Sequence, residues 1–133
     1  KDLMHWDVRD DDCPLLVGSR KAGAWDAAGR TGDPSVFLLG DTWYMVYYSW
    51  DRMHAQDGLA WTTRDEFPLG WRPVAENPIL RIGPPGSFDA LHAAKAFVLV
   101  HEGVYYHYYA AVAEDETREI ALATAPVAEW KLR

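Results

Sequence analysis

The fold is decided by the stretch Gly32-Asp33-Pro34-Ser35-Val36-Phe37-Leu38-Leu39-Gly40-Asp41-Thr42-Trp43-Tyr44-Met45-Val46-Tyr47-Tyr48-Ser49. Gly40-Asp41 is a tight-turn signal between a short apolar run and a second run rich in aromatic and β-branched residues, which predicts a β-hairpin. The return run, from Trp43 to Tyr48, is apolar at every position, so we expect the hairpin to be covered on both faces. The chain should therefore stack one sheet on another.

The composition is that of one globular domain. The chain has 133 residues, of which 49% are apolar and 25% charged. Its seven Trp, seven Tyr and four Phe favour β-sheet cores, with platforms for sugar rings as the functional alternative. A net charge of −7 argues against a nucleic-acid surface, and no apolar run is long enough for a membrane span. We expect neither nucleic acid nor a membrane as a partner.

The single cysteine, Cys13, cannot form an internal disulfide. We expect it to be a small buried thiol, and it does not decide the cellular compartment. The histidines have no ligand-like grouping along the sequence, and no paired-Cys or His-Glu-x-x-His motif occurs, so the residues predict no metal site.

The chain repeats itself at a period of 62 to 64 residues. The matching segments are Gly23–Ala27 with Gly86–Ala90, Trp43–Tyr48 with Tyr105–Ala110, and Gly58–Thr62 with Ala121–Ala125. Four strand candidates fall in each repeat: Ser35–Leu39, Trp43–Ser49, Gly58–Thr63 and Trp71–Val74, then Ala94–Val100, Val104–Ala111, Glu119–Thr124 and a start at Trp130. Four antiparallel strands at a fixed period predict β-propeller blades.

We therefore expect an all-β fold of two four-stranded antiparallel β-propeller blades, with a solenoid of another kind as the alternative. The expected organisation is one partial propeller domain over residues 1–133. Its blade repeats cover about 25–74 and 88–133, and residues 1–24 would end a preceding repeat.

Several motifs resemble those of the five-bladed β-propeller glycoside hydrolases, namely glycoside hydrolase family 43 and its relatives, the arabinanases, xylosidases and furanosidases. These motifs are Asp33–Val36 with Thr42–Tyr48, Gly58–Thr63, Asn77–Arg81, Gly86–Asp89 and His92–Lys95. Such enzymes close a ring of five blades, whereas this chain supplies two. The resemblance thus implies a fragment of a longer propeller or a self-associating homo-oligomer. It allows a calcium ion on the propeller axis and implies no other cofactor.

In a blade that meanders outward, the loop entering the inner strand and the loop between the second and third strands lie on one face. This rule groups four segments: Trp25–Asp33, Ser49–Asp57, Phe88–Lys95 and Ala113–Arg118. The turns Gly40-Asp41 and Glu102-Gly103 should lie on the opposite face. The candidate site therefore collects Trp25, Asp26, Asp33, Trp50, Asp51, Arg52, His54, Asp89, His92 and Lys95.

Glycoside hydrolysis needs one group that activates water and one that protonates the leaving oxygen. The resemblance implies an Asp at the head of an inner strand as general base, and Asp33 stands at that position; the alternative is that Asp-Pro is turn chemistry. Lys95 takes the equivalent place in the second repeat, and His92 lies three residues before it. His92 is a candidate general acid, and Lys95 either contacts substrate or forms an ion pair with Asp33 or Asp89.

The remaining candidates divide by whether they repeat. Asp26 and Asp89 recur at equivalent positions after an aromatic residue, which favours a structural role over substrate binding. The segment from Trp50 to His54 does not recur, so its side chains are favoured as substrate contacts: an indole stacks on a sugar, and Asp or Arg holds paired hydroxyls. A solvated loop is the alternative for that segment.

The leading functional hypothesis is a glycosidase-like protein that hydrolyses or recognises a carbohydrate at the face holding Asp33. Other blades or subunits would complete the pocket, and the general acid would be His92 or a residue outside the chain. The alternatives are a non-catalytic carbohydrate-binding or oligomeric assembly module, and a purely structural repeat.

Overall fold

The computed structural model describes residues 4–7 and 9–129. Within them the strands are β1 (Thr31–Leu39), β2 (Thr42–Trp50), β3 (Ala55–Thr63), β4 (Arg72–Pro73), β5 (His92–His101), β6 (Val104–Val112) and β7 (Arg118–Pro126). The helical segments of these residues are the short 3-10 turns η1 (Asp10–Asp12) and η2 (Val127–Glu129). The all-β prediction is confirmed, and seven of the eight strand candidates form. The eighth, starting at Trp130, lies outside the described residues.

Two antiparallel meanders make up the fold. β1, β2, β3 and β4 pair in sequence, and β5, β6 and β7 do the same. The turns that open the two meanders contain Gly40 and Gly103, with φ of +61° and +75°. Glycine adopts this left-handed conformation without steric cost, which is why both hairpins turn there.

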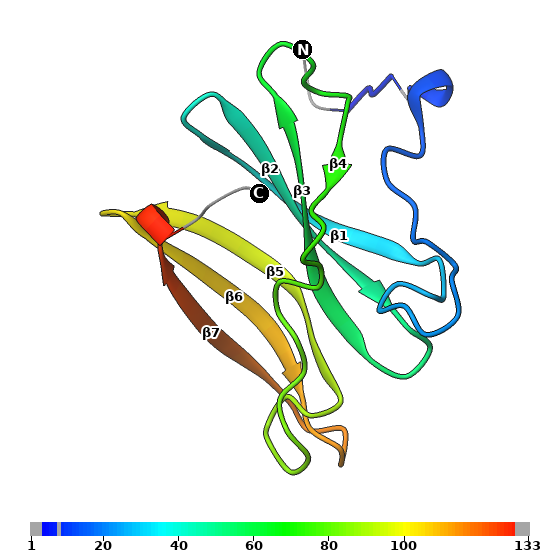
Figure 1. The fold of residues 1–133 in the computed structure, drawn as a ribbon, viewed down its shortest axis with the longest axis vertical. Helices are drawn as coiled ribbons and strands as arrows, with labels where there is room; N and C mark the ends of the chain where they lie inside the picture. The colour runs from blue at the N-terminus through cyan, green and yellow to red at the C-terminus, as the bar shows by residue number, and fades with distance from the viewer. Residues whose placement is uncertain (1–3, 8, 130–133) are drawn as a thin grey trace.

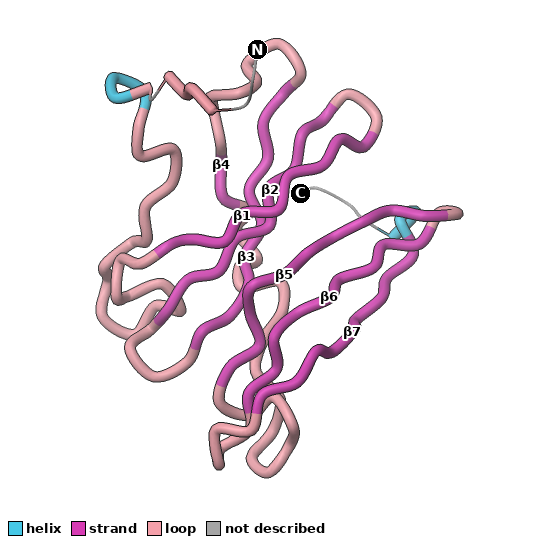
Figure 2. The backbone as a smooth tube through the Cα atoms, turned by 180° about the vertical axis from the view of Figure 1, so that it is seen from behind, coloured by secondary structure: helices cyan, strands magenta, loops and turns pink. Residues whose placement is uncertain are grey.

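The two meanders meet at their inner strands. β3 and β5 pair in parallel through one residue pair, Gln56 with Ala93, and β5 also lies against β1 and β2. Figures 1 and 2 show two fans of strands that diverge from this junction. The arrangement is consistent with two blades of a partial propeller.

The core lies between the two meanders. Its buried members are Tyr44, Val46, Leu59, Ala96, Val98 and Tyr105. Four consecutive residues of β2, from Tyr44 to Tyr47, are buried, which confirms that this strand is covered on both faces. Full burial of one aliphatic side chain such as Val46 contributes about 1.5–3 kcal/mol, so the junction of the meanders is a major source of stability.

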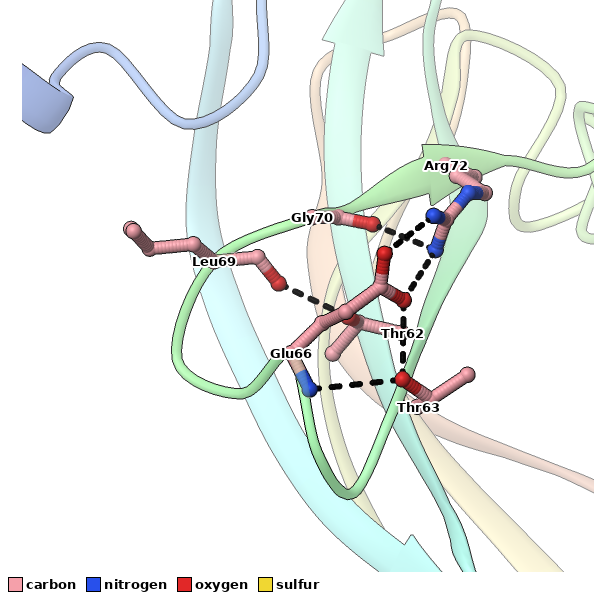
Figure 3. A network of polar contacts seen from close by, with 6 residues as sticks. All are labelled: Thr62, Thr63, Glu66, Leu69, Gly70 and Arg72. Atoms are coloured by element: carbon pink, nitrogen blue, oxygen red, sulfur yellow. Dashed lines mark hydrogen bonds and ion pairs between the residues drawn. The ribbon is translucent and has the colours of Figure 1, made fainter.

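A polar network closes the loop between β3 and β4 (Figure 3). The Glu66 carboxylate accepts hydrogen bonds from Arg72 and from the Thr63 hydroxyl, and the Thr62 hydroxyl donates to the carbonyl of Leu69, 2.7 Å away. The hydrogen bonds from Arg72 and Thr63 lower the pKa of Glu66 to about 2. This loop follows the far end of β3, so the network belongs to the face opposite the predicted site.

Two expectations outside the sheets also have outcomes. Cys13 is exposed, so the expectation of a buried thiol is wrong: it follows η1 in an extended segment that no sheet covers. Residues 9–24 form no strand. No helix in the described part of the chain has the length and hydropathy that crossing a membrane requires.

Candidate functional site

The strand directions bring the predicted site loops to one end of the molecule. β1 and β3 start where β2 ends, and β5 and β7 start where β6 ends. The parallel contact between β3 and β5 lies one residue from the start of each strand, which aligns these two ends. In Figure 1 the β1–β2 and β5–β6 turns both lie toward the left, at the other end. The grouping of loops is as predicted.

Asp33 and Lys95 lie in equivalent β-bulges near the heads of β1 and β5. Pairing shifts between Gly32 and Ser35 in one strand and between Ala94 and Phe97 in the other. The φ angles of Asp33 and Lys95 are +47° and +67°, a conformation that non-glycine residues rarely adopt. Bulges of this kind redirect side chains and are common next to active sites.

The two bulged residues form an ion pair with each other. The Lys95 Nζ atom lies 2.9 Å from Asp33 Oδ2 and 5.3 Å from the centre of the Tyr48 ring. The Asp33 side chain is 50% exposed, so it is accessible to solvent at the head of its strand. The hydrogen bond and the charge of Asp33 raise the pKa of Lys95. Of the two predicted roles for Lys95, the ion pair is the one this structure contains.

A buried carboxylate lies beneath the β5 bulge. Asp57 is fully buried, and its Oδ1 accepts a hydrogen bond of 2.9 Å from the backbone N–H of Lys95. Its Oδ2 lies 2.9 Å from His107 Nε2, and His107 Nδ1 lies 3.2 Å from the Tyr105 hydroxyl. Burial raises the pKa of Asp57, against the opposing effect of His107 and the backbone amides.

Sequence reasoning missed this pair. One signal was present: Asp57 and His107 each interrupt a run of apolar residues in a strand. A polar group in such a run must find a partner when the strand is buried.

The turn between β2 and β3 is organised by Asp51. Its Oδ1 accepts hydrogen bonds from the backbone N–H groups of Met53 and His54, at 2.7 and 2.8 Å, and its Oδ2 lies 3.2 Å from His54 Nδ1. Burial acts to raise the pKa of Asp51, but these hydrogen bonds outweigh it and lower the pKa. Arg52, at the tip of the turn, is exposed with φ +98°.

His92 joins this turn from the second meander. The backbone N–H of Ala55 donates to His92 Nδ1 over 3.0 Å, which leaves the ring proton on Nε2. Burial lowers the pKa of His92, and the charges of Arg118 and His54 add to that effect. The structure thus brings together the predicted residues Asp51, His54 and His92, and it adds Arg118, which the sequence did not single out.

The lowered pKa of His92 predicts a loss of stability in acid. Because the folded state holds this imidazole neutral, the unfolded chain binds more protons below its ordinary pKa of 6.5. The free energy of unfolding contributed by His92 is therefore complete above pH 6.5 and falls as the pH drops through the folded pKa. Urea unfolding at a series of pH values should show this decline, and His92→Gln should flatten it. An equal decline in both proteins would contradict the prediction.

Asp26 and Asp89 both fasten loops. Asp26 accepts from the Ser19 backbone N–H at 2.7 Å and from the Ser19 hydroxyl. Asp89 accepts from the Ser87 hydroxyl at 2.9 Å and from the Tyr109 hydroxyl at 3.0 Å. Each carboxylate is engaged by protein groups beside an inner strand, as the structural interpretation requires.

The two predicted aromatic platforms have protein contacts of their own. The Trp25 ring lies 5.9 Å from the Tyr47 ring and so close to Gly58 that a Cβ there would be 2.5 Å from the indole. Trp50, at the end of β2, has the Arg30 guanidinium 4.8 Å above its ring. Trp25 therefore packs on the first meander, while Trp50 stands at the edge of the site.

A shallow cavity of about 260 Å³ opens between the loop before β1 and the β2–β3 turn. Its lining residues are Arg20, Ala22, Gly23, Ala27, Asp51 and Arg52. Asp51 and Arg52 were predicted from the sequence; Arg20 was not. No group of three metal-ligating side chains occurs among the residues that the structure describes.

Comparison with known proteins finds similarity at the level of structure. No protein-family profile and no curated protein matches the chain. Among solved structures, one glycoside hydrolase is 31% identical over 71% of this chain, with a TM-score of 0.61. The chain has a glycoside hydrolase-like fold. A structure described as a complex of BT0996 and RGII is 33% identical over 71% of this chain, with a TM-score of 0.60.

A third structure extends the match of this glycoside hydrolase-like fold to most of the chain. Zg3597, a family 117 glycoside hydrolase produced by the marine bacterium Zobellia galactanivorans, is 16% identical over 90% of the chain, with a TM-score of 0.61. The chain covers 26%, 27% and 38% of these three proteins. It therefore spans well under half the length of the structures it resembles.

Proposed function

We propose that this chain forms two blades of a propeller glycoside hydrolase of the family 43 type and acts on a carbohydrate at the face that carries Asp33. The observation that carries the proposal is the geometry of Asp33. Its carboxylate is half exposed at a bulge at the head of an inner strand, with one oxygen held by Lys95 at 2.9 Å. That is the setting of a group that meets solvent and substrate.

In this proposal Asp33 is the general base. Its Oδ2 is bound to Lys95, and no hydrogen bond within residues 4–7 and 9–129 reaches Oδ1. Oδ1 can therefore accept a proton from a water molecule as the water oxygen attacks the anomeric carbon. The bond from that carbon to the leaving oxygen breaks at the same time, and a general acid gives the leaving oxygen its proton.

The general acid is assigned to another blade or subunit. His92 was the candidate within the chain, but its lowered pKa leaves the imidazole neutral at neutral pH. A neutral imidazole is a poor proton donor to a leaving alkoxide because its pKa for losing Nε2–H is far above the working pH. The inner strand that follows Asp33 offers Lys95 at the equivalent place, where a carboxylic acid would be needed.

The second meander supports the need for a further blade or subunit. Phe97, Ile120 and Leu122 are 65%, 86% and 49% exposed on its strands. A patch of large exposed apolar side chains on a sheet marks a surface that another element covers. Light scattering on a sizing column tests whether copies of this chain supply that element: a defined oligomer supports it, and a monomer assigns the role to further blades.

The cavity beside the β2–β3 turn is proposed to hold part of the sugar. Arg20 and Arg52 line it, and neither guanidinium has an ion-pair partner in the described part of the chain. The Asp51 carboxylate is occupied by its own turn. The two arginines are thus available to donate hydrogen bonds to sugar hydroxyls or to a carboxylate on the sugar.

The test is a combined assay of turnover and binding. Aryl arabinofuranosides and xylosides, arabinan, and the RGII named for one structural neighbour form the substrate panel. Released product with any of them supports the proposal. Binding without turnover would favour the carbohydrate-binding module instead, which the presence of Lys95 in place of a second acid also fits. Neither binding nor turnover would reject both.

A further inference from the structure

We propose that Asp57 is a positioning residue: from the buried layer below the site, and braced by His107, it sets the β5 bulge that aims Lys95 at Asp33. The geometry stands by itself, while its meaning for catalysis rests on the proposed function.

The first step is the hydrogen bonding of the bulge. A bulge leaves backbone N–H groups without partners in the strand ladder, and here pairing with β6 is interrupted between Ala94 and Phe97. The Lys95 N–H donates instead to Asp57 Oδ1 at 2.9 Å, and the Ala96 N–H also bonds the same carboxylate. Asp57 therefore replaces the missing ladder partners, and the bulge keeps its shape because of it.

The second step is that Asp57 itself is held rigidly. His107 Nε2 lies 2.9 Å from its second oxygen. Its backbone carbonyl accepts hydrogen bonds from Ile79 and Leu80, at 2.9 and 3.2 Å. The side chain is fully buried, so it has one conformation available and can define the position of the backbone that bonds to it.

The third step connects the two meanders. Asp57 belongs to β3 and Lys95 to β5, and the Lys95 side chain reaches back to Asp33 on β1. A surface ion pair between flexible side chains fixes geometry weakly. In this protein the backbone of the lysine is anchored from below by the same meander that carries Asp33, so the Lys95 ammonium is returned to one place.

The experiment measures the titration of the Lys95 side chain by NMR. Lys95 is faced by Asp33, Tyr48 and Arg118, and its pKa is raised chiefly by the hydrogen bond to Asp33. Asp33→Asn defines the pKa when that contact is lost. Asp57→Ala should lower the pKa of Lys95 toward the same value, and the double variant Asp33→Asn/Asp57→Ala should show little further fall, as expected for residues acting through one contact.

Two control variants separate positioning from charge and from general destabilisation. Asp57→Asn removes the same negative charge but keeps a side-chain oxygen that accepts the bulge N–H, so the pKa of Lys95 should stay near its wild-type value. Asp89→Ala removes another buried carboxylate, one that bonds Ser87 and Tyr109, and should leave Lys95 unchanged. Equal pKa values of Lys95 in Asp57→Ala and Asp57→Asn would overturn the proposal.

A second measurement needs no variant. If Asp57 accepts from the bulge, the Lys95 and Ala96 amides of the wild-type chain should exchange with solvent as slowly as the neighbouring ladder amides. Exchange as fast as in the exposed Glu102-Gly103 turn would overturn the proposal. Neither measurement uses turnover, so a failure of the proposed function would show separately, as absence of hydrolysis with an intact Lys95 contact.

Discussion

Asp33→Asn is expected to lower kcat by at least about 100-fold, the smaller end of the range for a general base, while sugar affinity stays within about twofold. Asparagine has the same shape and keeps an oxygen facing Lys95, but its amide cannot take a proton from the attacking water. The loss should therefore fall on kcat and not on binding. Steady-state kinetics on the best substrate of the panel, with calorimetric titration of the product sugar, measures both.

The control is an acid of the same type on the opposite face. Asp41 follows the turn glycine between β1 and β2 and lies 3.4 Å from Arg64, an exposed ion pair comparable with that of Asp33 and Lys95. Asp41→Asn should leave kcat unchanged. A kcat for Asp33→Asn equal to that of the control would contradict the assignment of the base.

The hairpin at residues 32–49 and the repeat were enough to predict the fold. Turn glycines and uninterrupted apolar runs act over a few residues, so a local pattern decides them. The repeat alignment also placed Lys95 opposite Asp33, and the structure puts both in equivalent bulges. The alignment could not give the 2.9 Å contact between them, because it depends on how far the inner strands of two blades stand apart.

The Asp57–His107 pair shows where sequence reasoning ended. The partners are 50 residues apart and lie on strands of different meanders, so their meeting depends on packing between blades, which no local pattern encodes. Cys13 failed for a related reason. Cysteine is usually buried, but its segment lies outside both meanders and only the tertiary structure reveals that.

His107→Ala is expected to lower the free energy of unfolding by about 3–5 kcal/mol, the usual cost of leaving one partner of a buried ion pair alone. The Asp57 carboxylate is fully buried, so without His107 it must either stay charged with only backbone amides as donors or take up a proton. Both states are less stable than the present one. Urea denaturation followed by tryptophan fluorescence measures the change.

The matched control for this variant is His101→Ala. His101 is exposed beside the β5–β6 turn, with Nε2 3.8 Å from Glu102, and its removal should change the free energy of unfolding by less than about 0.5 kcal/mol. A small effect of His107→Ala would mean that solvent or a proton replaces the imidazole cheaply. Asp57 would then not be held from below, and the rigidity that the Lys95 bulge requires would have to come from the strand pairing alone.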